Sequence, residues 1–386
     1  MSHDDIFDVP VEEVKPTVNA KSVEIKDELS SPVAKKFAFV GVGACGNRIV
    51  EGFWKRGYRR CWVGNTASVD LTMIDDAIPK MKFTKDEGQD GAGKSPDVAK
   101  EIVMIPVNRE ALRMSIGEAI GKNFDYIFVC AGLGGGTGSG AGPEIMKICK
   151  EYAASVDQDP ERVGCIISLP QASEGPRVNQ NALTALKDFY ALKPTPMILI
   201  DNHKIAVQKD TKILKHNQIA NEDTVKFIHA CNQLSATPAQ IAFDSADFGK
   251  VLDAGLLVFG MSAINEWKNG EEAVTKAVLE TFKTATLAEV ETSSATQAAC
   301  LFVAGEEVLD QFSSSSLTAA CDMLVRHMGK GAMVHRGIYP NERLKDKLMV
   351  YTMIGGLKPA KETIEVLAKA AQIEPSHPLA TFLGLS

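Results

Sequence analysis

Residues 132–140 read Gly-Leu-Gly-Gly-Gly-Thr-Gly-Ser-Gly, and this glycine run decides the fold. Glycine loses more conformational freedom on folding than any other residue, so such a run is expected where the main chain needs a positive φ or touches a ligand closely. A strand-like segment, Tyr126–Ala131, precedes the run, and a helix-like segment, Pro143–Lys150, follows it. A strand, a glycine loop and a helix N-terminus together present free N–H groups to an anion. The run therefore predicts a phosphate-binding loop.

Two other glycine loops compete for this role. Gly41-Val-Gly-Ala-Cys-Gly46 follows a strand-like run and matches the dinucleotide fingerprint, but the next strand-like run ends in Asn65-Thr66, where the fingerprint needs an acidic residue. Gly88–Ser95 matches the ATPase P-loop pattern, but it follows the charged stretch 82–87 instead of a buried strand. A dehydrogenase and a P-loop ATPase remain alternatives on these residues.

Composition narrows the class of protein. With 386 residues, 45% of them hydrophobic, the chain can bury a sizeable core and is expected to form two domains with tails. A net charge of −7 argues against direct nucleic-acid binding by the body of the protein. The eight cysteines form no Cys-x-x-Cys pair and are expected to be reduced core residues of a cytoplasmic protein. No apolar stretch suits a membrane span, and the seven histidines form no ligand-spaced set, so neither a membrane nor a structural metal is expected.

The order of the predicted elements indicates an α/β protein. Strand-like runs at 36–40, 61–64, 126–131, 163–169 and 196–201 alternate with helical segments, a pattern typical of a Rossmann-like parallel sheet with helices on both faces. A long helical pattern at 218–235 and a helix near 248–254 follow. Beyond them we predict strands at 256–262, 298–304, 332–338 and 347–354, with helices at 270–283, 315–328 and 359–372.

These patterns divide the chain into five parts. Residues 1–34 are acidic and poor in aromatic residues, which predicts a flexible arm, with ordered structure beginning at Lys36. The predicted divisions are the arm 1–34, a nucleotide-binding domain 35–217, a long central helix 218–236, a smaller α+β domain 237–356, and a C-terminal helix and tail 357–386.

Taken in order, the loops resemble those of the tubulin/FtsZ family of filament-forming GTPases. Gly134–Gly140 matches the family's phosphate signature without a gap, and Gly41–Arg48 resembles its first glycine loop. Asn65-Thr66 and Gly91–Pro96 occupy the places of its next two loops. Within the family, Leu169-Pro170, Leu199–Asn202 and Phe243–Phe248 look more like the TubZ branch of plasmid and phage proteins than like division FtsZ.

The resemblance implies a GTP/GDP site with Mg²⁺. The expected nucleotide-binding residues are Gly43, Ala44, Cys45, Gly46, Asn47, Asn65, Thr66, Gly93, Lys94, Gly134, Gly135, Gly136, Thr137, Gly138, Glu174, Arg177, Asn202, Asn221 and Asp223. Backbone N–H groups of 43–47 and 134–138 can cradle phosphates, and Asn202 can offer a donor and an acceptor to guanine. The alternatives are a helix cap for Thr137, a turn for Asn202 and a solvated surface position for Lys94. The register of the base contact within 221–223 stays open.

Asp244 and Asp247 are the predicted catalytic residues. Their i, i+3 spacing at the start of a helix places both on one face at the favourable end of the helix dipole, although an acidic first turn alone would also explain them. The family implies that this turn enters the next subunit's nucleotide site and orients the attacking water, so that hydrolysis depends on assembly. Ala242 stands where the family has an asparagine.

The expected partner is a second copy of the chain, since a head-to-tail contact does not close and gives filaments. The resemblance implies filaments that move or position plasmid or phage DNA or particles, with an FtsZ-like cell-division or cell-shape GTPase as the alternative. A DNA-bound adaptor or phage cargo is a further expected partner, but the tail 374–386 is not basic, so a Lys-rich adaptor contact is not expected there. Leu379, Phe382 and Leu383 are instead candidates to pack onto a neighbouring subunit.

Overall fold

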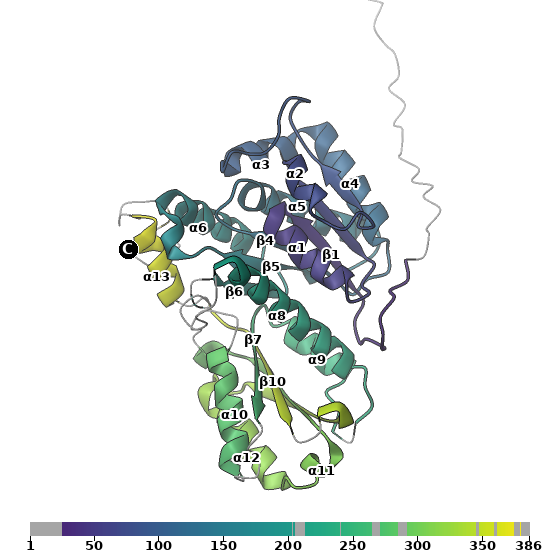
Figure 1. The fold of residues 1–386 in the computed structure, drawn as a ribbon, viewed down its shortest axis with the longest axis vertical. Helices are drawn as coiled ribbons and strands as arrows, with labels where there is room; N and C mark the ends of the chain where they lie inside the picture. Colours follow the sequence, from purple (N-terminus) through teal and green to yellow (C-terminus); the bar gives the residue numbers. More distant parts are fainter. Residues whose placement is uncertain are drawn as a thin grey trace, which may run out of the picture.

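The computed structural model describes residues 25–202, 204, 213–239, 241–264, 271–284, 292–344, 347–358, 361–373 and 379. Within them, ten strands form one mixed sheet in the order β3-β2-β1-β4-β5-β6-β7-β10-β8-β9 (Figure 1). The strands are β1 (Phe37–Val42), β2 (Cys61–Asn65), β3 (Lys80–Lys82), β4 (Tyr126–Gly132), β5 (Val163–Leu169), β6 (Met197–Asp201), β7 (Leu256–Ile264), β8 (Gln297–Ala304), β9 (Met333–Pro340) and β10 (Leu348–Gly355).

Helices flank this sheet along its length. The described helices are α1 (Gly43–Trp54), α2 (Ser68–Thr72), α3 (Pro96–Met104), α4 (Pro106–Ile120), α5 (Thr137–Ser155), α6 (Pro176–Ala191), α8 (Ile213–Leu234), α9 (Ser245–Leu252), α10 (Glu271–Thr284), α11 (Glu306–Leu309), α12 (Ser314–His327) and α13 (Lys361–Ala370). A short 3₁₀ turn, η2 (Ala172–Glu174), precedes α6.

The first half of the sheet is parallel and covered on both faces. Every residue of β1 is buried, as expected for a strand between two helical layers. Because side chains alternate along a strand, Val40 belongs to the buried cluster that includes residues of α3, α4, α5 and α6, whereas Phe39 belongs to the cluster on the other face, with residues of α1, α8 and α9. This parallel region is the Rossmann-like domain that the sequence predicts.

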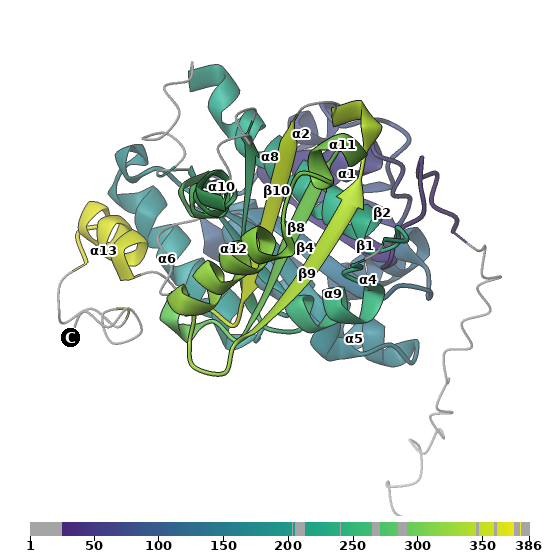
Figure 2. The ribbon, with the colours of Figure 1, turned by 90° about the horizontal axis from the view of Figure 1, so that it is seen from below.

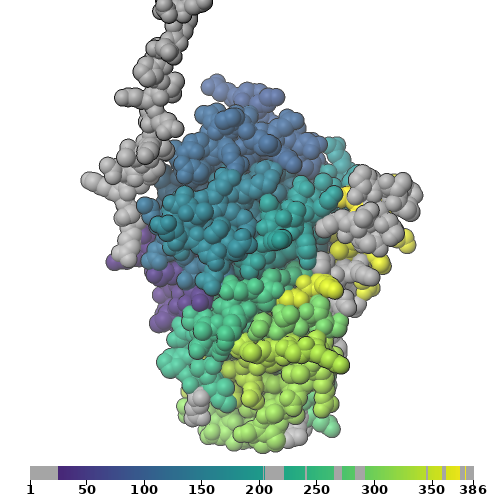
Figure 3. Space-filling model, turned by 180° about the vertical axis from the view of Figure 1, so that it is seen from behind, coloured from purple at the N-terminus to yellow at the C-terminus, as the bar shows by residue number. Residues whose placement is uncertain are grey.

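The second half of the sheet is mixed. β7 joins β6 through the pairs Met197↔Leu256 and Ile198↔Leu257, and β10 then pairs antiparallel with β7 and β8. Helices α10 and α12 pack together beside these strands (Figures 1 and 2). The space-filling view shows this smaller green body below the blue and teal one (Figure 3). The predicted fold class, an α/β domain joined by a long central helix to a smaller α+β domain, is confirmed.

The predicted strands and the helices of the second half are confirmed to within a few residues. The central helix α8 begins at Ile213, earlier than the predicted 218. The edge strand β3 was not predicted, because Lys80-Met-Lys82 is too short and too polar to show a period. The division of the chain into domains stays a proposal.

Two expectations about the chain ends differ from the structure. Residues 25–34 pack against the body, ahead of the predicted start at Lys36: the Arg60 guanidinium, 5% exposed, pairs with Asp27 at 2.5 Å and donates to the carbonyl of Ile25 at 2.7 Å. A buried guanidinium needs such partners. Leu379 is 4% exposed and packs in the chain's own core, so it is not available to pack onto a neighbouring subunit as predicted. Phe382 and Leu383 lie outside the described residues.

Candidate functional site

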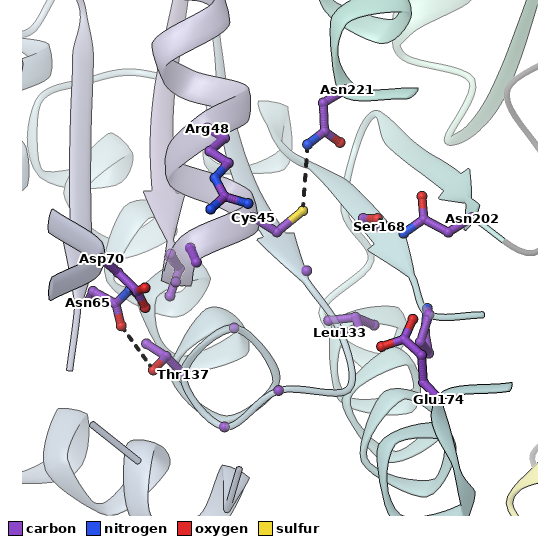
Figure 4. A pocket seen from close by; sticks show the side chains of 18 residues that line it. Cys45, Arg48, Asn65, Asp70, Leu133, Thr137, Ser168, Glu174, Asn202 and Asn221 are labelled. Atoms are coloured by element: carbon purple, nitrogen blue, oxygen red, sulfur yellow. Dashed lines mark hydrogen bonds between the residues drawn. The ribbon is translucent and has the colours of Figure 1, made fainter. Parts of the chain in front are cut away.

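A pocket of about 310 Å³ opens where β1, β2, β4, β5 and β6 end (Figure 4). The carboxyl edge of a parallel sheet is the usual ligand position in α/β folds. Its lining residues are Val42, Gly43, Ala44, Cys45, Arg48, Asn65, Asp70, Gly132, Leu133, Gly135, Gly136, Thr137, Gly138, Ser168, Pro170, Glu174, Asn202 and Asn221.

Two helix N-termini face this pocket, those of α1 at Gly43 and α5 at Thr137. Neither has a side-chain N-cap, so the first N–H groups of both helices are left for a ligand. The positive ends of both helix dipoles also favour an anion there. The backbone is special at this place, since Gly43 has φ +76° and Gly134 has φ +103°.

A chain of side-chain hydrogen bonds closes one end of the pocket. The Thr66 and Thr137 hydroxyls lie 2.7 Å apart, and Thr137 Oγ1 donates to Asn65 Oδ1 at 3.2 Å. Asn65 Nδ2 in turn donates to the Asp70 carboxylate at 2.9 Å. Thr137 is the first residue of α5, whose N-cap is Gly136, so its hydroxyl serves this network and does not cap the helix. The network fixes Asp70 beside the uncapped N-termini (Figure 4).

The other end of the pocket carries amide and hydroxyl groups. Asn202 Nδ2 donates to Ser168 Oγ at 3.0 Å, and Asn221 Nδ2 lies 4.0 Å from Cys45 Sγ (Figure 4). Glu174 accepts from the Gln171 N–H at 2.8 Å, which holds the turn η2 at the rim. Burial raises the pKa of the Cys45 thiol, and the hydrogen bond with Ser168 only partly opposes this. Cys45 is therefore a protonated thiol at neutral pH and not a nucleophile.

The structure brings most of the predicted binding residues together. Those that line the pocket are Gly43, Ala44, Cys45, Asn65, Gly135, Gly136, Thr137, Gly138, Glu174, Asn202 and Asn221. The others, Gly46, Asn47, Thr66, Gly93, Lys94, Gly134, Arg177 and Asp223, are not among the lining residues.

Some of these other residues make hydrogen bonds that hold the glycine loops in place. Asn47 is fully buried, and with its amide nitrogen turned toward them it reaches the carbonyls of Gly41 and Gly43 at 3.0 and 3.2 Å. The Lys94 carbonyl accepts from Asn181 Nδ2 at 3.1 Å, and the same amide reaches the Gly134 carbonyl at 3.2 Å. Asn181 therefore ties the loop 88–95 to the glycine run.

The predicted binding residues did not include seven that line the pocket: Val42, Arg48, Gly132 and Leu133, which lie in the predicted glycine loops, and Asp70, Ser168 and Pro170, which lie outside them. Ser168 and Gly132 carried a usable signal, because they stand near the carboxyl ends of predicted parallel strands. Arg48 and Asp70 lie on helices beyond the strand ends, where the sequence offers no such signal. Among the described lining residues, Arg48 is the one cationic side chain.

The two predicted catalytic aspartates do not line this pocket. Asp244 is the N-cap of α9: its Oδ1 accepts from the N–H groups of Ala246 and Asp247 at 2.8 and 2.9 Å. These bonds, that from Asp247 first, hold the pKa of the Asp244 carboxyl below its usual value. Asp247 Oδ1 pairs with Lys250 Nζ and with His335 Nδ1, each at 3.1 Å. The acidic turn is thus a stable helix start that also carries one exposed carboxylate, Asp244, and one partly exposed carboxylate, Asp247.

Comparison with known proteins identifies the domain around the pocket. Residues 36–210 match the GTPase domain model of the Tubulin/FtsZ family. This chain carries a tubulin/FtsZ-family GTPase domain. The pocket lies within the GTPase domain apart from Asn221, which α8 contributes.

Curated relatives are similar to this chain over much or nearly all of its length. Cell division protein FtsZ 1 of Pyrococcus furiosus is 26% identical over 376 residues, covering 94% of both chains. FtsZ of Aquifex aeolicus is 27% identical over 256 residues, covering 63% of this chain and 64% of that protein.

Solved structures share the fold. A GTPγS-form protofilament of TubZ from Bacillus thuringiensis serovar israelensis has a TM-score of 0.75 at 18% identity, covering 89% of this chain and 92% of that one. GTPγS-bound CetZ2 from Haloferax volcanii has a TM-score of 0.72 at 18% identity, covering 87% and 98%. The tubulin/FtsZ fold therefore extends beyond the GTPase domain, over 87–89% of this chain.

Neither the P-loop pattern nor the dinucleotide fingerprint has the structural setting that its motif requires. The stretch Gly88–Ser95 is a loop with Lys94 at φ +58°, and it follows the edge strand β3 instead of a buried central strand. Asp70 stands on α2, beyond the Asn65-Thr66 strand end where a dinucleotide fold would hold a ribose-binding acid. No cluster suited to a metal ion and no helix able to cross a membrane occurs in the described part of the chain.

Proposed function

We propose that this protein binds GTP with Mg²⁺, assembles head to tail into filaments, and hydrolyses GTP at the contact between subunits. One observation carries the proposal: the partly exposed acidic turn Asp244–Asp247 is absent from the lining of its own chain's pocket. Asp244 and Asp247 can then act on a nucleotide only in the pocket of another copy. The similar structures of TubZ and CetZ2 are protofilaments, which supports self-association.

The two ends of the pocket suit the two ends of GTP. The uncapped N-termini of α1 and α5 offer N–H groups to phosphate oxygens. The amides of Asn202 and Asn221 can pair with both donors and acceptors of a guanine edge. Glu174, at the rim of the pocket, is proposed to bind the ribose. Arg177, which is exposed, is proposed to contact the ribose as well.

A magnesium ion fits the phosphate end. Mg²⁺ prefers one or two carboxylates together with phosphate oxygens. Asp70 supplies such a carboxylate, and Asn65 fixes it from 2.9 Å. When bound, the ion would neutralise negative charge on the phosphates.

Exposed apolar side chains support a contact at both ends of the subunit. Val69 and Met73 flank Asp70 on and just after α2, and they are 64% and 71% exposed. Ile241 and Met333 lie near the acidic turn and near the start of β9, and they are 46% and 51% exposed. Apolar groups near the pocket of one copy and the turn of the next would lose contact with water when subunits stack. Because the two surfaces differ, the contact would repeat without closing.

In this contact the carboxylates of Asp244 and Asp247 orient a water molecule toward the terminal phosphate, the positioning role that phosphoryl transfer needs. The N–H groups at Oδ1 of Asp244 hold that carboxylate in one orientation. Ala242 offers no polar side chain to the water, so the two aspartates act without that partner.

The test measures phosphate release and sedimentation with GTP, ATP and no nucleotide. Asp244→Asn is the variant of choice, because asparagine keeps the N-cap while removing the charge. We expect this variant to form GTP-dependent filaments that hydrolyse GTP slowly and persist. Failure of the wild type to sediment with GTP at any magnesium concentration would refute assembly.

A mixing experiment tests the division of the site between subunits. Asp244→Asn subunits keep an unaltered pocket. Gly138→Ala subunits keep an unaltered acidic turn, but a Cβ at residue 138 would collide with the Gly132 carbonyl and distort the pocket. Mixing the two should restore part of the hydrolysis that each lacks alone. A site completed within one chain would give no recovery.

For the cargo we propose plasmid or phage DNA or particles, reached through an adaptor, in the cytoplasm of a bacterial or archaeal host. Similarity to FtsZ 1 along 94% of both chains favours the second candidate, a cell-division or cell-shape GTPase. A fluorescent fusion separates the two: a mid-cell ring with filamentous cells after deletion supports division, whereas loss of a plasmid or misplacement of phage particles after deletion supports transport.

A further inference from the structure

A buried histidine lies directly behind the acidic turn. His335, near the start of β9, is 8% exposed, and its Nδ1 lies 3.1 Å from Asp247 Oδ1. Its Nε2 lies 3.0 Å from Gln297 Oε1 at the start of β8. The ring also packs near Phe243, with ring centroids 6.1 Å apart. Residues from two strands therefore hold this imidazole against a carboxylate of α9.

The contacts on Asp247 are one-sided. Both His335 Nδ1 and Lys250 Nζ approach the same oxygen, Oδ1, at 3.1 Å. Among the described residues, Oδ2 of Asp247 has no such donor, and the side chain is 26% exposed. When hydrogen bonds hold one oxygen of a carboxylate, the other oxygen points in a fixed direction and can still accept a hydrogen bond from water.

We propose that His335 is a positioning residue for hydrolysis: its Nδ1–H bond to Asp247 Oδ1 fixes the carboxylate so that Oδ2 is presented to the water in the adjoining subunit's pocket. The inference rests on the proposed role of Asp247 in the next subunit's site. His335 itself touches neither GTP nor water in this scheme. Its contribution passes through one hydrogen bond.

Protonation supports this arrangement. Burial lowers the pKa of His335, and Lys250 acts in the same direction, while Asp247 and Asp244 oppose them. The ring is then neutral at neutral pH and carries a single N–H, which belongs on Nδ1 if it is to donate to Asp247. In this tautomer Nε2 is an acceptor, so the Gln297 side chain 3.0 Å away would turn its amide nitrogen toward the ring.

The test compares two substitutions of nearly equal polarity. The amide nitrogen of His335→Asn occupies the place of Nδ1 and can still reach Asp247, whereas that of His335→Gln reaches toward Nε2. We expect the Gln variant to lose about tenfold in GTP turnover per polymerised subunit, as is usual for residues that orient a reacting group through a hydrogen bond. The Asn variant should stay within about threefold of wild type. The critical concentration for assembly should change in neither.

Controls separate positioning from folding. His327→Gln alters an exposed histidine on α12. Its Nδ1 lies 2.7 Å from the Met323 carbonyl of the same helix and not beside the acidic turn, so turnover should not change. Adding His335→Gln to Asp247→Asn should cause no further loss, because the bond is already weakened. Melting temperatures of all variants are measured alongside.

The outcomes are distinguishable. Equal turnover in the Asn and Gln variants, whether both high or both low, overturns the positioning role of His335. If Asp247→Asn hydrolyses GTP like wild type, the proposed function of the acidic turn fails instead, whatever the histidine does. Loss of sedimentation in the Gln variant alone would assign His335 to subunit assembly and would also overturn the proposal.

Discussion

Gly138→Ala is expected to distort the phosphate loop without unfolding the protein. A Cβ at this position would lie closer than 3.0 Å to the carbonyl oxygen of Gly132, a separation that real Cβ atoms essentially never show. Both groups are backbone, at the end of β4 and in the first turn of α5, so no flexible side chain can move aside. To regain ordinary contact the first turn of α5 must retreat by about 1 Å.

The cost can be worked from this displacement. Misplacing a positioned group by about 1 Å can cost about 100-fold, or about 2.7 kcal/mol of interaction. Overpacking itself costs about 1–3 kcal/mol of stability, which for a chain of this size lowers the melting temperature by only a few degrees. We therefore expect GTP affinity to fall about 100-fold in a protein that remains folded at 25 °C.

The assay is titration with a fluorescent GTP analogue, followed by thermal melting of the same samples. The matched control is Gly88→Ala, since a Cβ there meets only Asp86 Oδ1 at an ordinary 3.7 Å and Gly88 does not line the pocket. The control should bind the analogue like wild type. If Gly138→Ala also binds within threefold of wild type, the main chain at this turn does not hold the nucleotide and the reasoning is wrong.

Three further predictions concern stability. Asp27→Ala should lower the free energy of unfolding, measured in urea, by about 3 kcal/mol, because it leaves Arg60 buried without its charge partner. The control is Glu28→Ala, which alters a side chain that is 69% exposed and should leave the urea midpoint unchanged. Asp244→Ala should cost about 1 kcal/mol through the lost N-cap, whereas Asp244→Asn should not; equal urea midpoints would show that the cap contributes nothing. Burial lowers the pKa of His229 from 6.5 to about 4, so the unfolded chain alone takes up this proton as pH falls through 6.5 toward 4 and stability declines there. His229→Gln should reduce the drop in urea midpoint between pH 7 and pH 5, and an unchanged drop would rule out His229 as its source.

The fold was predictable where strands are buried on both faces. Continuous apolar runs such as Phe37–Val42 appear in the sequence as strands because both sides of the sheet are covered. β3 escaped prediction because an edge strand of three residues has little apolar pattern. The packing of residues 25–34 also escaped, since Asp27 looks like one more acid of a charged arm until Arg60 is found opposite it.

The candidate site was predictable where it consists of backbone. Glycines signal close approach directly, so the loops at Gly43 and Gly134–Gly138 could be found from sequence alone. Side chains that converge from helices gave no such signal, as Arg48 and Asp70 illustrate. The pairing of His335 with Asp247 joins residues far apart in the chain, and only the tertiary structure brings them together.

The proposed phosphate cradle at the N-termini of α1 and α5 has a genetic consequence. Its binding groups are main-chain N–H groups, which every residue except proline possesses, so no substitution other than one to proline can remove a binding group as it would remove a lysine. What mutation can do is add atoms, because every missense change of a glycine codon introduces a side chain. Selection on such a site therefore acts to keep space empty. The glycines from Gly132 to Gly140 should consequently tolerate fewer substitutions than the polar residues around them. In a deep mutational scan of this chain, substitutions in this run should lower fitness more than substitutions at the flanking positions.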